Sequence, residues 1–159
     1  MRTLIYTSLA VITFATGTAN VQAAAITPGD LVIYRVGDGS AALSSASTAV
    51  FLDEYTTSGT LVQSFALPTT GGSALTATGN STTEGTLSLS QNGLSFVYTG
   101  YREDVGGSSP STLTYTAANR VIGTLSLAGV TDTSTSITSD GGITTGNAIR
   151  SVTTVDGTA

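Results

Sequence analysis

The side chains of this 159-residue chain that could take part in chemistry are mainly carboxylates. Cys and His are both absent, and every basic residue is an arginine. Structural zinc sites need thiolates or imidazoles, and Ser–His–Asp and Cys–His nucleophiles need a histidine. Without cysteine there is also no disulfide. We therefore assign no catalytic residue and no cofactor-binding residue.

The adjacent carboxylates Asp53 and Glu54 lie in the apolar run Ala49–Tyr55. Glycosidases place two carboxylates about 5–9.5 Å apart across a sugar. Neighbouring residues of a strand point to opposite faces, however, so this pair cannot enclose one substrate. We expect one of the two to pair with Arg35, which interrupts another apolar run, and the other to face solvent. Arg35→Met is then expected to destabilise less than removal of the acceptor.

Other acidic residues occur in turns. The dipeptides Asp38-Gly39, Asp140-Gly141 and Asp156-Gly157 could ligate calcium through oxygen. Asp-Gly is also the ordinary turn dipeptide, and no twelve-residue loop with alternating acids is present, so metal binding stays open. Glu103-Asp104 beside Arg102 is typical of a solvated turn.

Four tyrosines on expected strands allow two interpretations. They could form a platform on which sugars stack, or they could belong to the hydrophobic core, where strand aromatics more often lie. The residues are Tyr34, Tyr55, Tyr98 and Tyr101.

Composition favours a folded β protein over a disordered chain. Hydrophobic residues make up 40% and charged residues only 9%, against about 25% charged in ordinary domains. Disorder usually combines high net charge with few apolar residues. The net charge of −5 and the lack of a basic patch exclude nucleic acid as a partner.

The first 23 residues have the pattern of a secretory signal peptide. A positive start at Arg2 precedes the apolar run Leu4–Ala15, and Val21-Gln22-Ala23 fits the small-x-small cleavage rule. Cleavage is expected after Ala23, with a second choice after Ala25. The run is shorter than the roughly 20 residues needed to span a membrane. The sequence thus predicts a secreted, periplasmic or extracellular protein without a membrane span.

The mature region, residues 24–159, alternates strand-forming runs with turns and shows no helical periodicity. Thr56-Thr57-Ser58-Gly59 predicts a hairpin turn, and Thr69–Thr83 predicts a long loop with a short edge strand at Ala74–Thr78. The expected strands are Leu31–Val36, Ala49–Tyr55, Thr60–Leu67, Thr86–Ser90, Leu94–Tyr101, Thr112–Thr116, Val121–Leu127, Ser134–Thr138 and Ala148–Thr154.

An offset repeat shapes the expected architecture. Gly85–Leu94 leads into an Asn92-Gly93 turn, and Ile149–Thr158 begins alike with Asp156-Gly157. The two turns are 64 residues apart, which leaves room for about four strands. We therefore expect antiparallel four-stranded blades of an incomplete β-propeller, with a β-sandwich as the alternative. The second copy stops after its turn, so Thr153–Ala159 should be unpaired and the repeat domain truncated.

Residues Thr27–Pro68, Glu84–Tyr101 and Asn119–Gly157 resemble the opening of uncharacterised secreted bacterial proteins with propeller-like repeats. The likeness is most specific at residues 34–39 (YRVGDG) and 51–55 (FLDEY). Proteins that look like this continue well beyond the present C-terminus, and no catalytic residues come with the resemblance.

Two functions follow as hypotheses. The first is a secreted, non-enzymatic β-repeat scaffold or surface-binding module, with an unknown surface or carbohydrate ligand and with self-association through free strand edges. The alternative is the N-terminal fragment of an exported carbohydrate-active enzyme whose catalytic residues lie outside this chain.

Overall fold

A computed structural model describes residues 24–139 and 146–157 of the protein. Within these ranges the chain forms an open antiparallel sheet of nine strands with two short 3-10 helices. The predicted all-β class is confirmed. No helix in the same ranges is long and apolar enough to cross a membrane. The predicted signal segment, residues 1–23, and the Asp140-Gly141 turn lie outside the described residues.

Most strands lie where apolar, β-branched runs predict them. The β2–β3 turn closes as expected, because Gly59 takes φ +85° and Thr56 donates its N–H to the carbonyl of Thr60. The strands are β1 (Leu31–Val36), β2 (Ser47–Tyr55), β3 (Leu61–Ala66), β4 (Thr76–Thr78), β5 (Ser88–Leu89), β6 (Ser95–Tyr101), β7 (Arg120–Ser126), β8 (Thr131–Asp132) and β9 (Ser136–Ile137), and the helices are η1 (Gly71–Ser73) and η2 (Pro110–Thr112).

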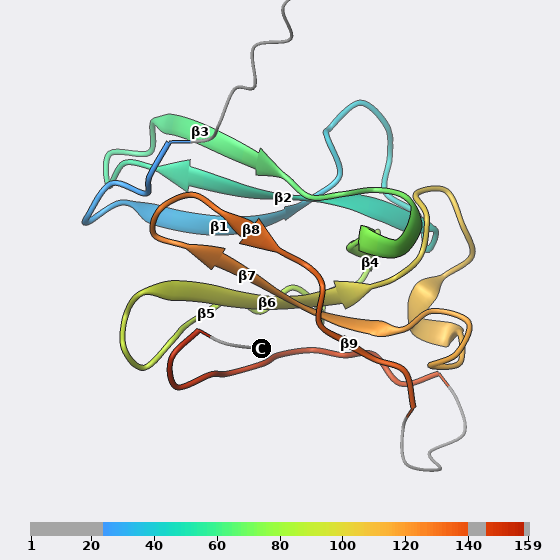
Figure 1. Ribbon diagram of the computed structural model, residues 1–159. Helices are drawn as coiled ribbons and strands as arrows, with labels where there is room; N and C mark the ends of the chain where they lie inside the picture. Colours follow the sequence, from blue (N-terminus) through green and yellow to red (C-terminus); the bar gives the residue numbers. More distant parts are fainter. Residues whose placement is uncertain (1–23, 140–145, 158–159) are drawn as a thin grey trace, which may run out of the picture.

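The long strand β2 joins the two halves of the sheet. Its second half pairs with β1 on one side and β3 on the other, and its first half pairs with β4. Strand β4 then pairs with β6 through a single register position, Thr76 opposite Tyr101. The sheet folds over at this junction, so that β1, β2 and β3 form one layer and β5, β6 and β7 lie in the other (Figure 1).

The hydrophobic core lies between the two layers. Inward-facing side chains alternate along β2, where Val50, Leu52 and Glu54 are completely buried. The Tyr34 hydroxyl of β1 crosses to the other layer and donates to the carbonyl of Thr99, 3.0 Å away. The core residues are Ile26, Val50, Leu52, Phe65, Leu67, Leu75, Ala77, Tyr98, Val121 and Leu125.

The structure departs from the expected architecture in several places. The structure does not show the blades of a propeller, because its strands belong to one open sheet that does not close. The segment expected as an edge strand, β4, is fully buried between β2 and β6. Residues 112–116 contain the end of η2 and a turn, and residues 148–154 form no strand.

The expectation of an unpaired C-terminal segment is wrong for residues 154–156. The N–H groups of Gln91 and Asn92 donate to the carbonyls of Thr154 and Val155, at 3.1 and 3.0 Å. The Asn92 side chain donates to the carbonyl of Asp156 at 3.0 Å. The two turns of the offset repeat therefore lie side by side and satisfy each other's backbone groups. Thr158 and Ala159 lie outside the described residues.

Candidate functional site

The outer face of β1, β2 and β3 carries a charged pair at its centre. The Arg35 guanidinium donates from Nε to Asp53 Oδ2 at 2.5 Å and from Nη2 to Asp53 Oδ1 at 3.2 Å. Ser64 of β3 donates its hydroxyl to Asp53 Oδ1, and Arg35 Nη1 donates to the carbonyl of Gly37. The predicted ion pair of Arg35 with a carboxylate is confirmed, with Asp53 as the partner.

This pair is held in a fixed geometry. The guanidinium carbon of Arg35 lies 4.2 Å from the centre of the Phe51 ring, a cation–π contact. Desolvation raises the pKa of Asp53, but the hydrogen bonds from Arg35 and Ser64 outweigh it and hold that pKa below its usual value. An ionised carboxylate of lowered pKa is a poor general base. The arrangement therefore suits binding rather than proton transfer.

Apolar side chains surround this pair on the same layer. Leu31 and Ile33 of β1 are 53% and 47% exposed, and Leu61 and Val62 of β3 are 51% and 47% exposed. The term outer face is used below for these four residues together with Arg35, Phe51, Asp53, Tyr55 and Ser64.

Glu54 lies on the opposite side of β2, as the alternation requires, but it does not face solvent as expected. Its side chain is completely buried and accepts hydrogen bonds from the Thr27 N–H at 2.7 Å and from Gln63 Nε2 at 2.5 Å. Desolvation raises the pKa of Glu54, and these hydrogen bonds, with one from Asp30, lower it below its usual value. The pKa of the neighbouring Asp30 carboxyl is raised, mainly by desolvation and to a smaller extent by the negative charge of Glu54.

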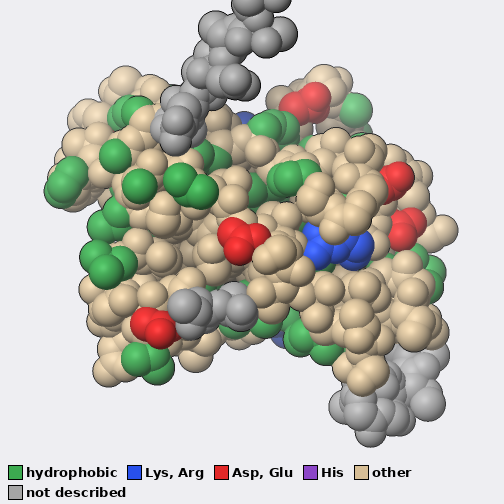
Figure 2. Space-filling view, in the orientation of Figure 1, with side chains coloured by type: hydrophobic (Ala, Val, Ile, Leu, Met, Phe, Trp, Pro, Cys, Tyr) green, Lys and Arg blue, Asp and Glu red, His purple; other side chains and the backbone are tan. Residues whose placement is uncertain are grey.

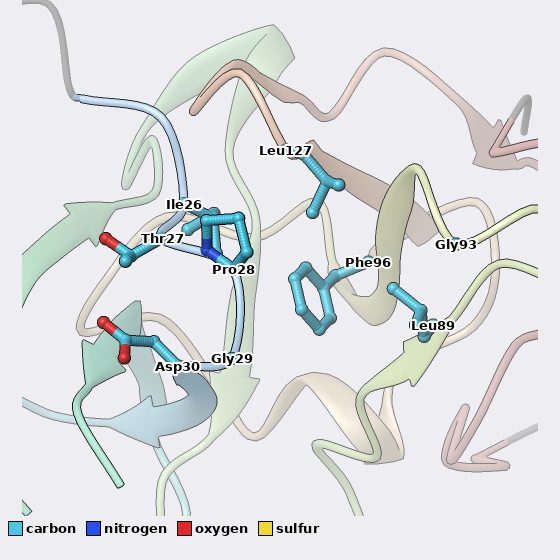
Figure 3. Close-up of a pocket in the computed structure, with 9 residues that line it drawn as sticks. All are labelled: Ile26, Thr27, Pro28, Gly29, Asp30, Leu89, Gly93, Phe96 and Leu127. Carbon is cyan, nitrogen blue, oxygen red and sulfur yellow. The ribbon is translucent and has the colours of Figure 1, made fainter.

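A pocket of about 230 Å³ lies beside the entry turn, residues 26–30. Apolar side chains of Ile26, Phe96 and Leu127 converge on it, while the side chains of Thr27 and Asp30 point away from Phe96 (Figure 3). No charged group is directed into the space from these labelled residues. The pocket therefore offers apolar contact without an evident chemical role.

The other sequence candidates have structural roles. Asp38 accepts from the backbone and side chain of Ser40, an ordinary Asx turn. Asp104 accepts from the Gly71 N–H, whereas neighbouring Arg102 donates to the carbonyls of Ala74 and Thr133. No group of three or more acidic side chains able to hold a metal occurs in the described part of the chain.

The four tyrosines do not form a platform. Tyr98 and Tyr101 are completely buried, and the Tyr34 ring lies 6.3 Å from that of Tyr98 between the layers. Burial raises the pKa of Tyr34 and of Tyr98 well above the usual value. Tyr55 lies on the outer face instead. The interpretation as core residues is therefore confirmed for Tyr34, Tyr98 and Tyr101.

Sequence reasoning missed the buried Arg120. Its guanidinium lies 4.3 Å from the centre of the Tyr115 ring and donates to the carbonyls of Ala118 and Asn147, at 2.7 and 2.8 Å. It thereby ties the C-terminal segment to β7. Arg120 opens an apolar strand much as Arg35 interrupts one, so the same cost of burying a guanidinium could have identified it.

Figure 2 shows that charged side chains are few and scattered on the visible side of the molecule, among polar uncharged and apolar atoms.

Comparisons with protein-family models, with curated proteins and with solved structures found no match to this chain. The resemblance to secreted propeller-like repeat proteins therefore stays a prediction.

Proposed function

We propose that the chain is a secreted, non-enzymatic scaffold module of sandwich-like build that associates with further copies of itself through the outer face. This proposal is supported most directly by the half-exposed aliphatic side chains of the two edge strands, β1 and β3. Among the described residues, β1 and β3 each pair only with β2, so no further strand occupies their outer edges. Isolated apolar residues on a surface need no explanation, but a contiguous group marks an interaction site.

A second copy of the chain is the occupant that the charges favour. Arg35 and Asp53 neutralise each other, so the centre of the outer face presents no net charge that a copy would oppose. An antiparallel pairing of two identical edge strands is compatible with a two-fold axis. Natural proteins commonly protect such edges with lysine, and this chain has none.

The alternative of an enzyme fragment gains no support from Asp53 and Glu54, because these carboxylates lie on opposite faces of β2 and both are held by hydrogen bonds. Export, bacterial origin and a propeller-like repeat in a longer protein stay predictions from the sequence.

The test is light scattering of the purified chain, residues 24–159, over a range of concentrations. We expect the average mass to rise with concentration, and Leu31→Lys to keep the chain monomeric because it places a charge on the edge of the outer face. Leu94→Lys is the matched control, since Leu94 is 58% exposed and belongs to the β5–β6 turn. A wild-type chain that stays monomeric, or a control that disrupts association equally, would refute the proposal.

A further inference from the structure

The entry segment Ala24–Thr27 is bound to both layers of the sheet by its backbone. The Ala24 N–H donates to Gln63 Oε1 at 3.0 Å, and Gln63 Nε2 donates back to the Ala24 carbonyl at 3.0 Å. The Ile26 N–H donates to the carbonyl of Leu127 at 2.8 Å, and its side chain enters the core. The first residues of the predicted mature chain are thus part of the folded structure.

Gln63 links this segment to the buried carboxylate of Glu54. Its amide oxygen points to the Ala24 nitrogen, and its amide nitrogen donates to Glu54 Oε2 at 2.5 Å. An amide in this orientation stabilises a positive charge at Ala24 and a negative charge at Glu54 at the same time.

Glu54 lacks a cationic partner among the described contacts. Its recorded partners are the neutral amide of Gln63, the Thr27 N–H and the Asp30 carboxyl, while Arg35 is engaged by Asp53 on the other face. Hydrogen bonds keep this buried carboxylate ionised, and a positive charge nearby would stabilise it further. Hydrolysis of the Ala23–Ala24 peptide bond by an export-associated endopeptidase would consume one water and leave a carboxylate on Ala23 and an amine on Ala24. That amine has an ordinary pKa of about 8, so it is an ammonium at neutral pH.

We propose that Gln63 and Glu54 form the binding site for the chain's own α-ammonium group, generated when processing frees Ala24. This inference rests on the export part of the proposed function. It favours cleavage after Ala23 over cleavage after Ala25, because the later cut removes the residue that Gln63 binds. Processing would then supply the positive charge that the buried carboxylate lacks.

The direct test compares urea unfolding of three chains at pH 6, beginning at Ala24, at Nα-acetylated Ala24 and at Ile26. A charge-assisted hydrogen bond predicts that acetylation lowers the folding equilibrium constant by about tenfold. The chain beginning at Ile26 should lose at least as much. Equal stability of the free and acetylated chains would overturn the binding site.

Two controls separate charge recognition from a loss of packing. In Glu54→Gln and in Gln63→Leu the effect of acetylation should largely disappear, and an undiminished effect would contradict the proposal. The bound ammonium should have a raised pKa, so its contribution is full below about pH 8 and is lost as pH rises through the folded-state value. Among the titratable groups at the site, Glu54 of β2 has a lowered pKa and Asp30 of the entry turn has a raised pKa, while β3 and the β7–β8 turn contribute neutral groups.

The processing step has its own readout. N-terminal sequencing of protein secreted by a bacterial host should give Ala24, and a chain that begins at Ile26 or keeps residues 1–23 would overturn the assigned cut. The unfolding experiments use purified chains of defined start, so they test the α-ammonium site separately from export and from self-association.

Discussion

Replacing Arg35 with methionine removes the cation from an ion pair whose partners differ strongly in exposure. The Asp53 side chain is 2% exposed and the Arg35 side chain 37%. Arg35→Met therefore leaves a buried carboxylate with the Ser64 hydroxyl as its remaining recorded partner. Asp53→Ala instead leaves a guanidinium that keeps the Gly37 carbonyl and reaches water. The structure thus reverses the order expected from the sequence, in which loss of the acceptor was the worse change.

The exposure values also set the size of the effect. Breaking a buried ion pair by removing one partner costs about 3–5 kcal/mol, and exposed pairs contribute less than about 1 kcal/mol. Arg35 is partly exposed, so we expect about 2 kcal/mol for Arg35→Met, between these limits. Asp53→Ala should cost about 1 kcal/mol, the value of an ordinary hydrogen bond.

Urea unfolding followed by circular dichroism measures both changes, with the double variant to obtain the coupling energy. The pKa of Asp53 is lowered in the folded protein, so the stabilisation is present above its unfolded pKa of about 3.9 and is lost as pH falls below that value. The deficit of Arg35→Met should therefore shrink as pH falls from 7 to 3. A larger loss for Asp53→Ala, or a deficit that does not change with pH, would refute this reasoning.

Three further predictions test the interior. Gly123→Ala should destabilise by about 1–3 kcal/mol in urea unfolding, because its new Cβ would clash with ring carbons of Tyr98; unchanged stability would contradict the tight packing. Glu54→Gln should cost about 1 kcal/mol at pH 7, and since the pKa of Glu54 is lowered, the difference from wild type should fade below about pH 4. Arg120→Met should speed proteolytic cleavage within residues 146–157, detected by mass spectrometry, because the Asn147 carbonyl loses its donor; an unchanged cleavage rate would argue against this anchor.

Local chemistry explains why much of the sheet could be predicted. Strand β1 has the predicted bounds, and β2, β3, β6 and β7 differ from prediction by one or two residues at their ends. These strands are runs of β-branched and apolar residues bounded by glycine or polar turns, so their signal is contained in the nearest neighbours. The segment expected at Ala148–Thr154 has similar composition, yet it forms no strand, and the carbonyl of its last residue, Thr154, accepts from the Gln91 N–H of the β5–β6 turn. Propensity alone does not specify which partner a segment finds.

The sequence by itself determined the all-β class, the exclusion of zinc, disulfide and histidine chemistry, and the placement of Asp53 and Glu54 on opposite faces of one strand. Each follows from residue type or from the two-residue period of a strand, which do not depend on distant parts of the chain. Only the tertiary structure decided which face was buried. The second layer covers the side of β2 that carries Glu54, and Gln63 and the Thr27 N–H then satisfy a carboxylate that was expected in water. Burial depends on contacts between residues far apart in the chain, such as the 3.0 Å hydrogen bond from Tyr34 to Thr99 across the layers, and a local pattern carries no information about them.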